Sequence, residues 1–170
     1  GLLKPNKGEI FIDDVGFAQL NINSYQARIG YITQEPVVFN DTIFNNVTLW
    51  AEPTAENSLR FQEALSKASL IDYVENLPLK AETLLGNNGI NLSGGQKQRI
   101  SIARELFKEI DILILDEATS ALDSETEKEI QMNIDNIKGK YTVLIIAHRL
   151  STVKNADKVY QMDKGEIIGE

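Results

Sequence analysis

The stretch ILILDEATSALD, Ile112–Asp123, decides the fold that this sequence predicts. Four apolar residues run directly into Asp116 and Glu117, a pattern typical of a buried strand with carboxylates at its carboxyl end. A second apolar stretch, Tyr141–Ala147, leads in the same way to His148. In parallel α/β sheets, ligands gather at the carboxyl ends of the strands. We therefore expect these acids and the histidine to lie at one edge of a sheet.

Helical patterns precede both strands. Ser93 begins a predicted helix that runs to about Lys108 and carries a capping-box pattern at its start. A second capping-box pattern, Ser124–Glu127, opens a helix with isoleucines at helical spacing. The alternation of helices with continuous apolar strands predicts an α/β fold. It has a mostly parallel sheet with flanking helices, and both faces of the sheet are expected to be covered.

The rest of the chain adds a helical region and shorter strands. Strand patterns occur at Gly8–Asp14 and Arg28–Thr33, and two more are expected around a turn at Lys164 and Gly165. Residues 42–92 are mostly helical in pattern. This predicts a helical subdomain that is inserted between strands of the sheet core and continues through the following helix. Residues 1–170 are predicted to form one domain.

The composition excludes several classes of site. The net charge of −8 argues against a nucleic-acid partner bound through its phosphates. The chain has no cysteine and one histidine, so a disulfide framework and a transition-metal cluster are not expected. No apolar run reaches the roughly 18 residues that a membrane-spanning helix needs.

The four residues Ser93-Gly94-Gly95-Gln96 could bind an anion. The start of a helix has free N–H groups and a partial positive charge, and two glycines let a phosphate approach the backbone. An ordinary helix cap after a Gly-rich loop explains the same residues, and on spacing alone it is the commoner case.

Asp116 and Glu117 fit magnesium-dependent chemistry on a phosphate. Mg²⁺ takes oxygen ligands and keeps several waters, so one carboxylate can hold it while the second orients or deprotonates an attacking water. A helix-capping pair is the other explanation, and the residues alone do not separate the two. His148 follows a predicted strand and could donate a hydrogen bond to a phosphate, but it is a weak signal alone. Gln34, at the end of another predicted strand, is likewise weak alone.

One part of a nucleotide site is missing from these residues. A phosphate-binding P-loop reads G-x-x-x-x-G-K-[ST]. The Gly139-Lys140 pair is followed by Tyr141 and lacks the upstream glycine. The sequence therefore predicts magnesium and γ-phosphate contacts without a cradle for the nucleotide.

Four stretches together strongly resemble the nucleotide-binding domain of ABC transporters. LSGGQKQR, Leu92–Arg99, matches the family signature, and ILILDEATSALD matches the Walker B strand, the catalytic glutamate and the D-loop. YITQEPVVF, Tyr31–Phe39, resembles the Q-loop, and IIAHRLSTV, Ile145–Val153, resembles the H-loop. Their order and approximate spacing agree over nearly the whole chain. The resemblance implies the P-loop NTPase-like sheet of an ABC ATPase, with the P-loop expected upstream of Gly1.

The resemblance also implies a role for each candidate residue. Asp116 would hold Mg²⁺ through water, and Gln34 would reach the Mg²⁺ and the attacking water. Glu117 would polarise that water, His148 would contact the γ-phosphate, and Asp123 would help to link two sites. A second nucleotide-binding domain, paired head to tail, would hold the ATP on which four signature residues close. These are Ser93, Gly94, Gly95 and Gln96.

The wording of the motifs resembles exporters. DEATSALD occurs with AHRLST, whereas importer domains more often have proline where Ala118 stands. An exporter domain implies ATP and Mg²⁺, a fused or associated transmembrane domain, and a place at the cytoplasmic face of the cell membrane. ATP-driven dimerisation and hydrolysis would be coupled to transport. Asn87 stands where exporters usually carry a glutamate that senses the membrane domain, so that contact departs from the family pattern.

Two alternatives remain beside the exporter. One is a soluble ABC ATPase without transport, against which stand the exporter-like motifs and the lack of a long coiled-coil insertion between Gln34 and Ser93. The other is a non-catalytic partner without a P-loop, against which stand the intact Glu117 and His148. Because the P-loop is missing, these 170 residues alone are not expected to hydrolyse ATP. The transported molecule and the choice between homodimer and heterodimer are left open.

Overall fold

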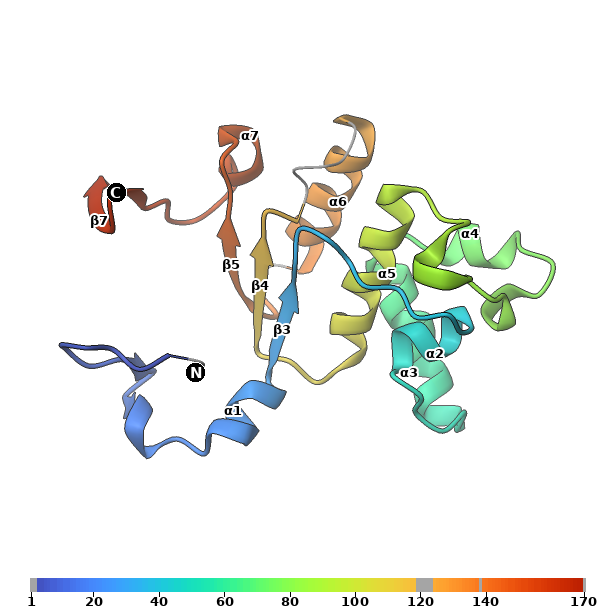
Figure 1. Ribbon diagram of the computed structural model, residues 1–170, viewed down its shortest axis with the longest axis horizontal. Helices are drawn as coiled ribbons and strands as arrows, with labels where there is room; N and C mark the ends of the chain where they lie inside the picture. The colour runs from blue at the N-terminus through green and yellow to red at the C-terminus, as the bar shows by residue number, and fades with distance from the viewer. Residues whose placement is uncertain (1–2, 119–123, 138, 170) are drawn as a thin grey trace.

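A three-stranded parallel sheet lies at the centre of the computed structural model, which describes residues 3–118, 124–137 and 139–169. The strand order is β3 (Ile29–Ile32), β4 (Ile112–Asp116), β5 (Thr142–Ile146) (Figure 1). Asp116 of β4 pairs with Ile146 of β5, so the carboxyl ends of the strands meet at one edge. The predicted parallel sheet is confirmed.

Helices α5 (Gly94–Phe107) and α6 (Ser124–Ile137) pack on one face of this sheet. That face carries Ile32, Leu113 and Leu115, each no more than 2% exposed. Helix α5 has the predicted bounds to within a residue, because Ser93 caps its start and Lys108 ends it. The cap of α6 involves residues that lie outside the described part of the chain.

The opposite face of the sheet differs from the prediction. Tyr31, Leu144 and Ile146 point to that side and are 48%, 53% and 46% exposed. Helices therefore cover one face in the described residues, where the sequence predicted cover on both. An unbroken apolar run does not show which side a helix occupies. In β5 every second residue is exposed because α5 and α6 both lie on the other side.

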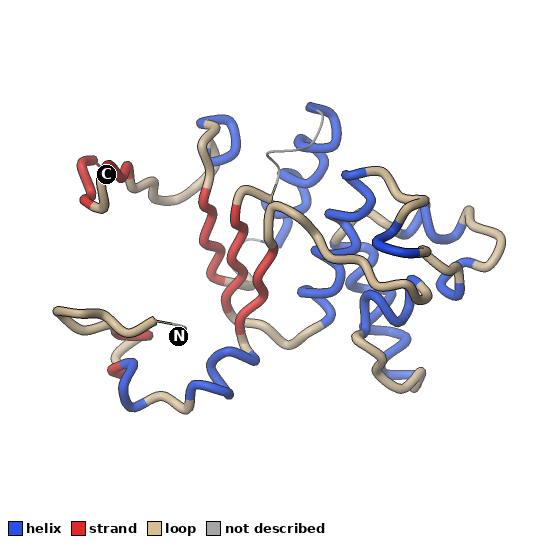
Figure 2. The backbone as a smooth tube through the Cα atoms, viewed as in Figure 1, coloured by secondary structure: helices blue, strands red, loops and turns tan. Residues whose placement is uncertain are grey.

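Three helices gather beside α5, away from the strands (Figures 1 and 2). They are α2 (Ile43–Thr48), α3 (Ala55–Lys67) and α4 (Ile71–Glu75). Thr42 and Thr54 cap α2 and α3 by accepting a hydrogen bond from a backbone N–H in the first turn. Their buried side chains join the core: Ile43, Val47, Phe61, Ala64, Leu65 and Val74. The boundaries proposed for a separate subdomain, residues 42–92, stay a prediction.

Short 3₁₀ turns and small elements complete the chain. They are β1 (Phe11–Ile12), β2 (Val15–Gly16), η1 (Phe17–Gln19), α1 (Ile22–Ala27), η2 (Lys80–Glu82), η3 (Asn87–Gly89), α7 (Leu150–Val153), β6 (Gln161–Asp163) and β7 (Glu166–Gly169). The predicted hairpin around Lys164 and Gly165 is confirmed by the antiparallel pairing of β6 with β7. The predicted strand at Gly8–Asp14 is shorter than expected, because the chain turns at Asp13 and pairs back on itself.

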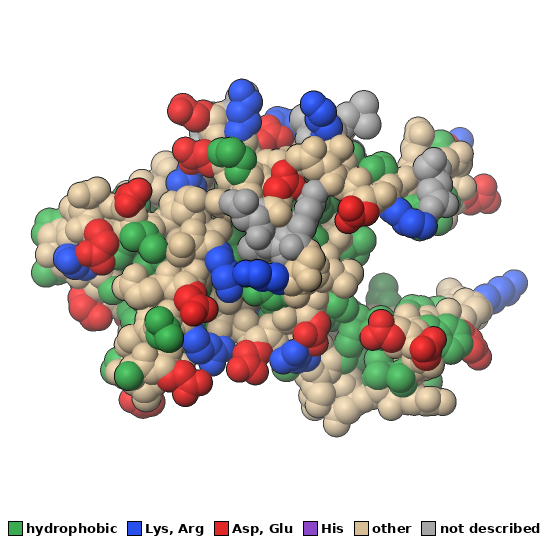
Figure 3. Space-filling model, turned by 180° about the vertical axis from the view of Figure 1, so that it is seen from behind, with side chains coloured by type: hydrophobic (Ala, Val, Ile, Leu, Met, Phe, Trp, Pro, Cys, Tyr) green, Lys and Arg blue, Asp and Glu red, His purple; other side chains and the backbone are tan. Residues whose placement is uncertain are grey.

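The surface mixes charges of both signs. On the face shown in Figure 3, acidic and basic side chains are interspersed rather than gathered by sign. No helix in the described ranges has both the length and the apolar character needed to cross a bilayer.

Candidate functional site

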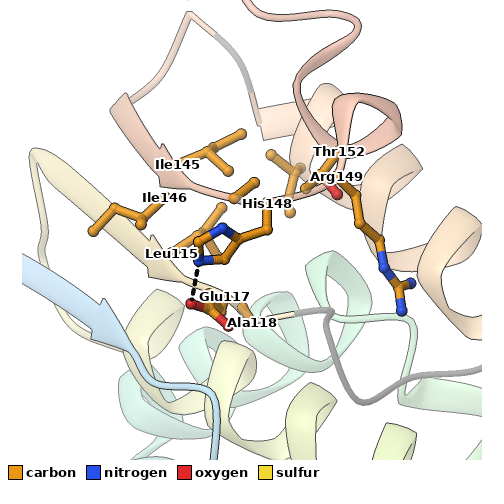
Figure 4. A pocket seen from close by; sticks show the side chains of 10 residues that line it. Leu115, Glu117, Ala118, Ile145, Ile146, His148, Arg149 and Thr152 are labelled. Atoms are coloured by element: carbon orange, nitrogen blue, oxygen red, sulfur yellow. Dashed lines mark ion pairs between the residues drawn. The ribbon is translucent and has the colours of Figure 1, made fainter. Parts of the chain in front are cut away.

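The carboxyl ends of β4 and β5 bring Glu117 and His148 together. Glu117 follows β4 with a φ of 48°, a left-handed conformation that non-glycine residues seldom adopt. Its backbone N–H donates to the carbonyl of Ile146 across the strand ends, at 3.0 Å. Nε2 of His148 lies 3.0 Å from Oε1 of Glu117 (Figure 4). Two residues 31 positions apart in the sequence thus meet, as the strand-end argument predicted.

A small cavity opens beside this pair. Its volume is about 70 Å³, far below the roughly 300 Å³ at which small-molecule sites begin, so it has room for waters rather than for a nucleotide. The Glu117 side chain is 30% exposed there, whereas the His148 side chain is 83% exposed at the rim. Apolar side chains form most of the wall: Leu115, Ala118, Ile134, Ile145, Ile146 and Ala147. A carboxylate at such a wall interacts more strongly with a nearby proton or charge than it would in open water.

Asp116 has a partner that the sequence did not point to. The hydroxyl of Tyr31 donates to Oδ2 of Asp116 at 2.6 Å. Tyr31 pairs with Ile114, two residues before Asp116 on the same face, and a tyrosine is long enough to reach this diagonal neighbour. The bond to the carboxylate raises the pKa of the Tyr31 phenol above its usual value. Within the part of the chain that the structure describes, Oδ1 of Asp116 is left available for another ligand.

Gln34 lies at the same edge, two residues after β3, and is exposed. It does not line the cavity with Glu117 and His148 in the described part of the chain. The structure therefore places Gln34 at the predicted edge of the sheet, where the carboxyl ends of the strands lie. Its contact with a metal or a water stays a prediction.

The start of α5 forms the predicted capping box. The Ser93 hydroxyl accepts from the Gln96 N–H at 3.2 Å, and Gln96 Oε1 accepts from the Ser93 N–H at 2.9 Å. A Cβ added at Gly94 would meet no atom within 4 Å, so the approach to this helix end is open. Gly95 continues the same turn and is partly exposed. Asp123, the remaining predicted site residue, lies outside the described residues.

Helix α5 is tied to the chain that follows β3 by two buried polar residues. Gln98, 1% exposed, donates to the carbonyl of Thr33 at 3.3 Å, next to Gln34. Arg104, 7% exposed, donates to the carbonyls of Val37 at 2.8 Å and Asn46 at 2.7 Å. Burial lowers the pKa of the Arg104 guanidinium. The sequence analysis did not predict these hydrogen bonds. An arginine on the apolar face of a predicted helix could have indicated that its side chain is buried and bonds to backbone carbonyls.

The chemistry of these groups fits a phosphate with Mg²⁺. The described residues hold no group of three or more acidic, histidine or cysteine side chains that could bind a metal alone. One half-buried carboxylate at a strand end, Asp116, is what Mg²⁺ needs when phosphate oxygens and waters supply the other ligands. Glu117 can accept a proton from water, and His148 can donate a hydrogen bond to a phosphate oxygen.

Fold and site together define an α/β domain whose parallel sheet carries acids at its strand ends and whose helix α5 has an open start, capped by Ser93 before two glycines. Comparison with known proteins gives the family. The family model described as ABC transporter matches residues 1–120. The chain belongs to the ABC transporter family.

Relatives from the same family align over almost the whole chain. The ATP-dependent lipid A-core flippase of Bordetella avium (strain 197N) is 46% identical over 164 residues, which is 96% of this chain and 28% of the flippase. That of Shewanella oneidensis is 42% identical over 161 residues, 95% of this chain and 27% of the flippase. A bacterial Atm1-family ABC exporter solved with ATP bound superposes with a TM-score of 0.85 at 36% identity, over 98% of this chain and 29% of that one. The chain thus spans between a quarter and a third of these proteins.

Proposed function

We propose that these residues are part of the ATP-hydrolysing domain of an ABC exporter and that Glu117 is its catalytic base. The observation that carries the proposal is the meeting of Glu117 and His148 at 3.0 Å, at the strand ends where Asp116 is also placed. The similarity to exporters over almost the whole chain supports the same conclusion.

Each residue has a defined task in this mechanism. Glu117 orients the attacking water and accepts its proton, and the small cavity beside that carboxylate has room for this water. His148 exchanges its contact with Glu117 for a γ-phosphate oxygen and donates a hydrogen bond to it. Asp116, held by Tyr31, and Gln34 would hold Mg²⁺. When bound, Mg²⁺ neutralises the charge that develops on the phosphate oxygens.

The start of α5 serves a different nucleotide from the one that Glu117 acts on. In the described residues no hydrogen bond or ion pair joins Ser93 to Glu117 or His148, and the helix end faces open space at Gly94. A second nucleotide-binding domain, paired head to tail, would present ATP to Ser93–Gln96. ATP would thus join two domains at the cytoplasmic face of the membrane, hydrolysis would release them, and a fused or associated transmembrane domain would use that motion.

The names of these relatives do not give a single transported molecule. The sequence relatives are named lipid A-core flippases, whereas the solved structure is of an Atm1-family exporter. Both are matched through the same ATP-hydrolysing part at 36% to 46% identity. Specificity for the transported molecule would reside outside these residues, so they support ATP-driven export without a named cargo.

The test is Glu117→Gln in the full-length protein. We expect ATP turnover to fall by at least about 100-fold, since the substitution removes the proton acceptor. ATP binding should persist and the ATP-bound dimer should accumulate. Glu109→Gln is the matched control, because it removes a carboxylate that is 75% exposed, before β4 rather than at its carboxyl end. Turnover within twofold of the unmodified protein in Glu117→Gln would overturn the assignment.

A further inference from the structure

We propose that Glu127 is a positioning residue for His148: it binds two side chains of the segment that directly follows the histidine. The inference rests on the proposed function, because it assigns Glu127 a part in orienting a residue of that site. Glu127 lies in the first turn of α6, 21 positions before His148, and is not itself in the cavity.

Glu127 binds two residues of the segment after His148. Its Oε2 accepts from Nη1 of Arg149 at 3.0 Å, and its Oε1 accepts from the hydroxyl of Thr152 at 3.2 Å. One turn further along α6, Gln131 donates to the carbonyl of Thr152 at 2.7 Å. The Glu127 side chain is only 13% exposed and Thr152 is 8% exposed, so the bond between them is largely shielded from water, whereas the Arg149 side chain is 51% exposed. Helix α6 therefore fixes both ends of a four-residue segment that starts directly after His148.

The backbone of Arg149 links these bonds to the orientation of His148. Arg149 has an extended backbone, with φ −102° and ψ 127°. Side chains of adjacent residues in an extended backbone point to opposite sides. Figure 4 shows this arrangement: His148 points toward Glu117, and Arg149 points away from it. Because the two residues are adjacent, holding the Arg149 side chain against α6 restrains the backbone that carries His148 beside the cavity.

His148 needs such support because few neighbouring atoms fix the position of its side chain. Its side chain is 83% exposed, and the contact that orients it in this structure is the one to Glu117. That contact must open when a phosphate and a water enter. Once it opens, the bond between Glu127 and Arg149 is what keeps the imidazole facing the site.

A simple helix-end role does not account for these contacts. An acid in the first turn of a helix interacts favourably with the helix dipole, and Glu125 occupies that first turn as well. Glu127 differs because it is shielded and bonds Arg149 and Thr152. Glu125 is exposed and therefore serves as the matched control for loss of charge from the same turn.

The experiment measures ATP turnover of the full-length protein carrying Glu127→Gln. Loss of these bonds should lower kcat by about 10- to 100-fold, the scale expected when a reacting group is misplaced by about 1 Å. The KM for ATP should stay within about twofold, and the thermal midpoint should stay close to that of Glu125→Gln, which keeps full turnover. A role limited to folding would lower the midpoint and leave kcat per folded molecule unchanged.

Arg149→Gln attacks the same bond from the other side. Its side chain is 51% exposed, so this second variant carries less risk of misfolding. It should lower kcat as Glu127→Gln does. The double variant should be no slower than the slower single variant, since both substitutions remove the same Glu127–Arg149 bond. Normal kcat in both single variants, or multiplicative losses in the double variant, would overturn the inference. If Glu117→Gln is inactive while Glu127→Gln is normal, only this inference fails; if Glu117→Gln is active, the proposed function fails.

Discussion

Replacing Arg104 with methionine should loosen the segment between β3 and α2 without unfolding the domain. Arg104 joins three acceptors: the carbonyl of Val37 and both the carbonyl and the side-chain oxygen of Asn46. Its guanidinium also lies 5.0 Å from the centre of the Phe39 ring. Methionine fills a similar length and makes none of these polar bonds.

The size of the effect follows from the acceptors that are left behind. The carbonyl of Asn46 lies in the last turn of α2, where no later helical N–H is available to it, and that of Val37 lies in a loop. Each buried acceptor that loses its donor costs about 1–3 kcal/mol. The variant no longer buries a charged guanidinium, and the desolvation cost that it avoids offsets part of this loss of stability. We therefore expect a local destabilisation of about 3 kcal/mol, or somewhat more than 100-fold in the opening equilibrium.

Hydrogen exchange followed by mass spectrometry on the full-length protein measures this opening directly. Amide protons of residues 37–48 should exchange about 100-fold faster in Arg104→Met if they exchange through local opening. Arg60→Met is the matched control. Arg60 also bonds a backbone carbonyl, that of Phe107, and lies over its ring, but it is only partly buried and makes one such bond. Equal acceleration in the two variants would refute the argument from burial.

Two further substitutions test the site. Tyr31→Phe should weaken Mn²⁺ binding to the nucleotide-bound full-length protein by about tenfold, measured by electron paramagnetic resonance, because Asp116 loses the hydroxyl that orients it; an unchanged affinity, equal to that of the distant Tyr73→Phe, contradicts this role. Ser93→Ala should cost about 1 kcal/mol at the start of α5 and weaken ATP-dependent dimerisation, seen by size-exclusion chromatography with light scattering. Thr54→Ala removes an equivalent cap from α3 and should leave dimerisation unchanged, so equal effects would count against an ATP contact at Ser93.

The strand-end prediction succeeded because it depends on local sequence. A run of apolar residues that ends in polar ones shows where a strand stops, and parallel strands stop at the same edge. This reasoning brings Glu117 and His148 to one edge of the sheet, where the structure has them 3.0 Å apart. The capping box at Ser93 is equally local, since four consecutive residues make both of its bonds.

Coverage of the sheet was predicted less well. The apolar run of β5 indicated burial on both sides, yet Leu144 and Ile146 are about half exposed. Hydrophobicity reports the preference of a side chain for the interior. It does not report which neighbouring element is available to bury that side chain.

The sequence by itself determined the parallel sheet, the order of the motifs and the acids and histidine at the strand ends. The tertiary structure alone decided which side chains hold those groups in place. Tyr31 reaches Asp116 across 85 positions because the β3–β4 register puts them diagonally on one face. Glu127 reaches Arg149 across 22 positions because the first turn of α6 lies against the segment that follows His148. Such contacts depend on register and helix placement, which arise from packing of the whole chain and leave no periodic signal in the sequence.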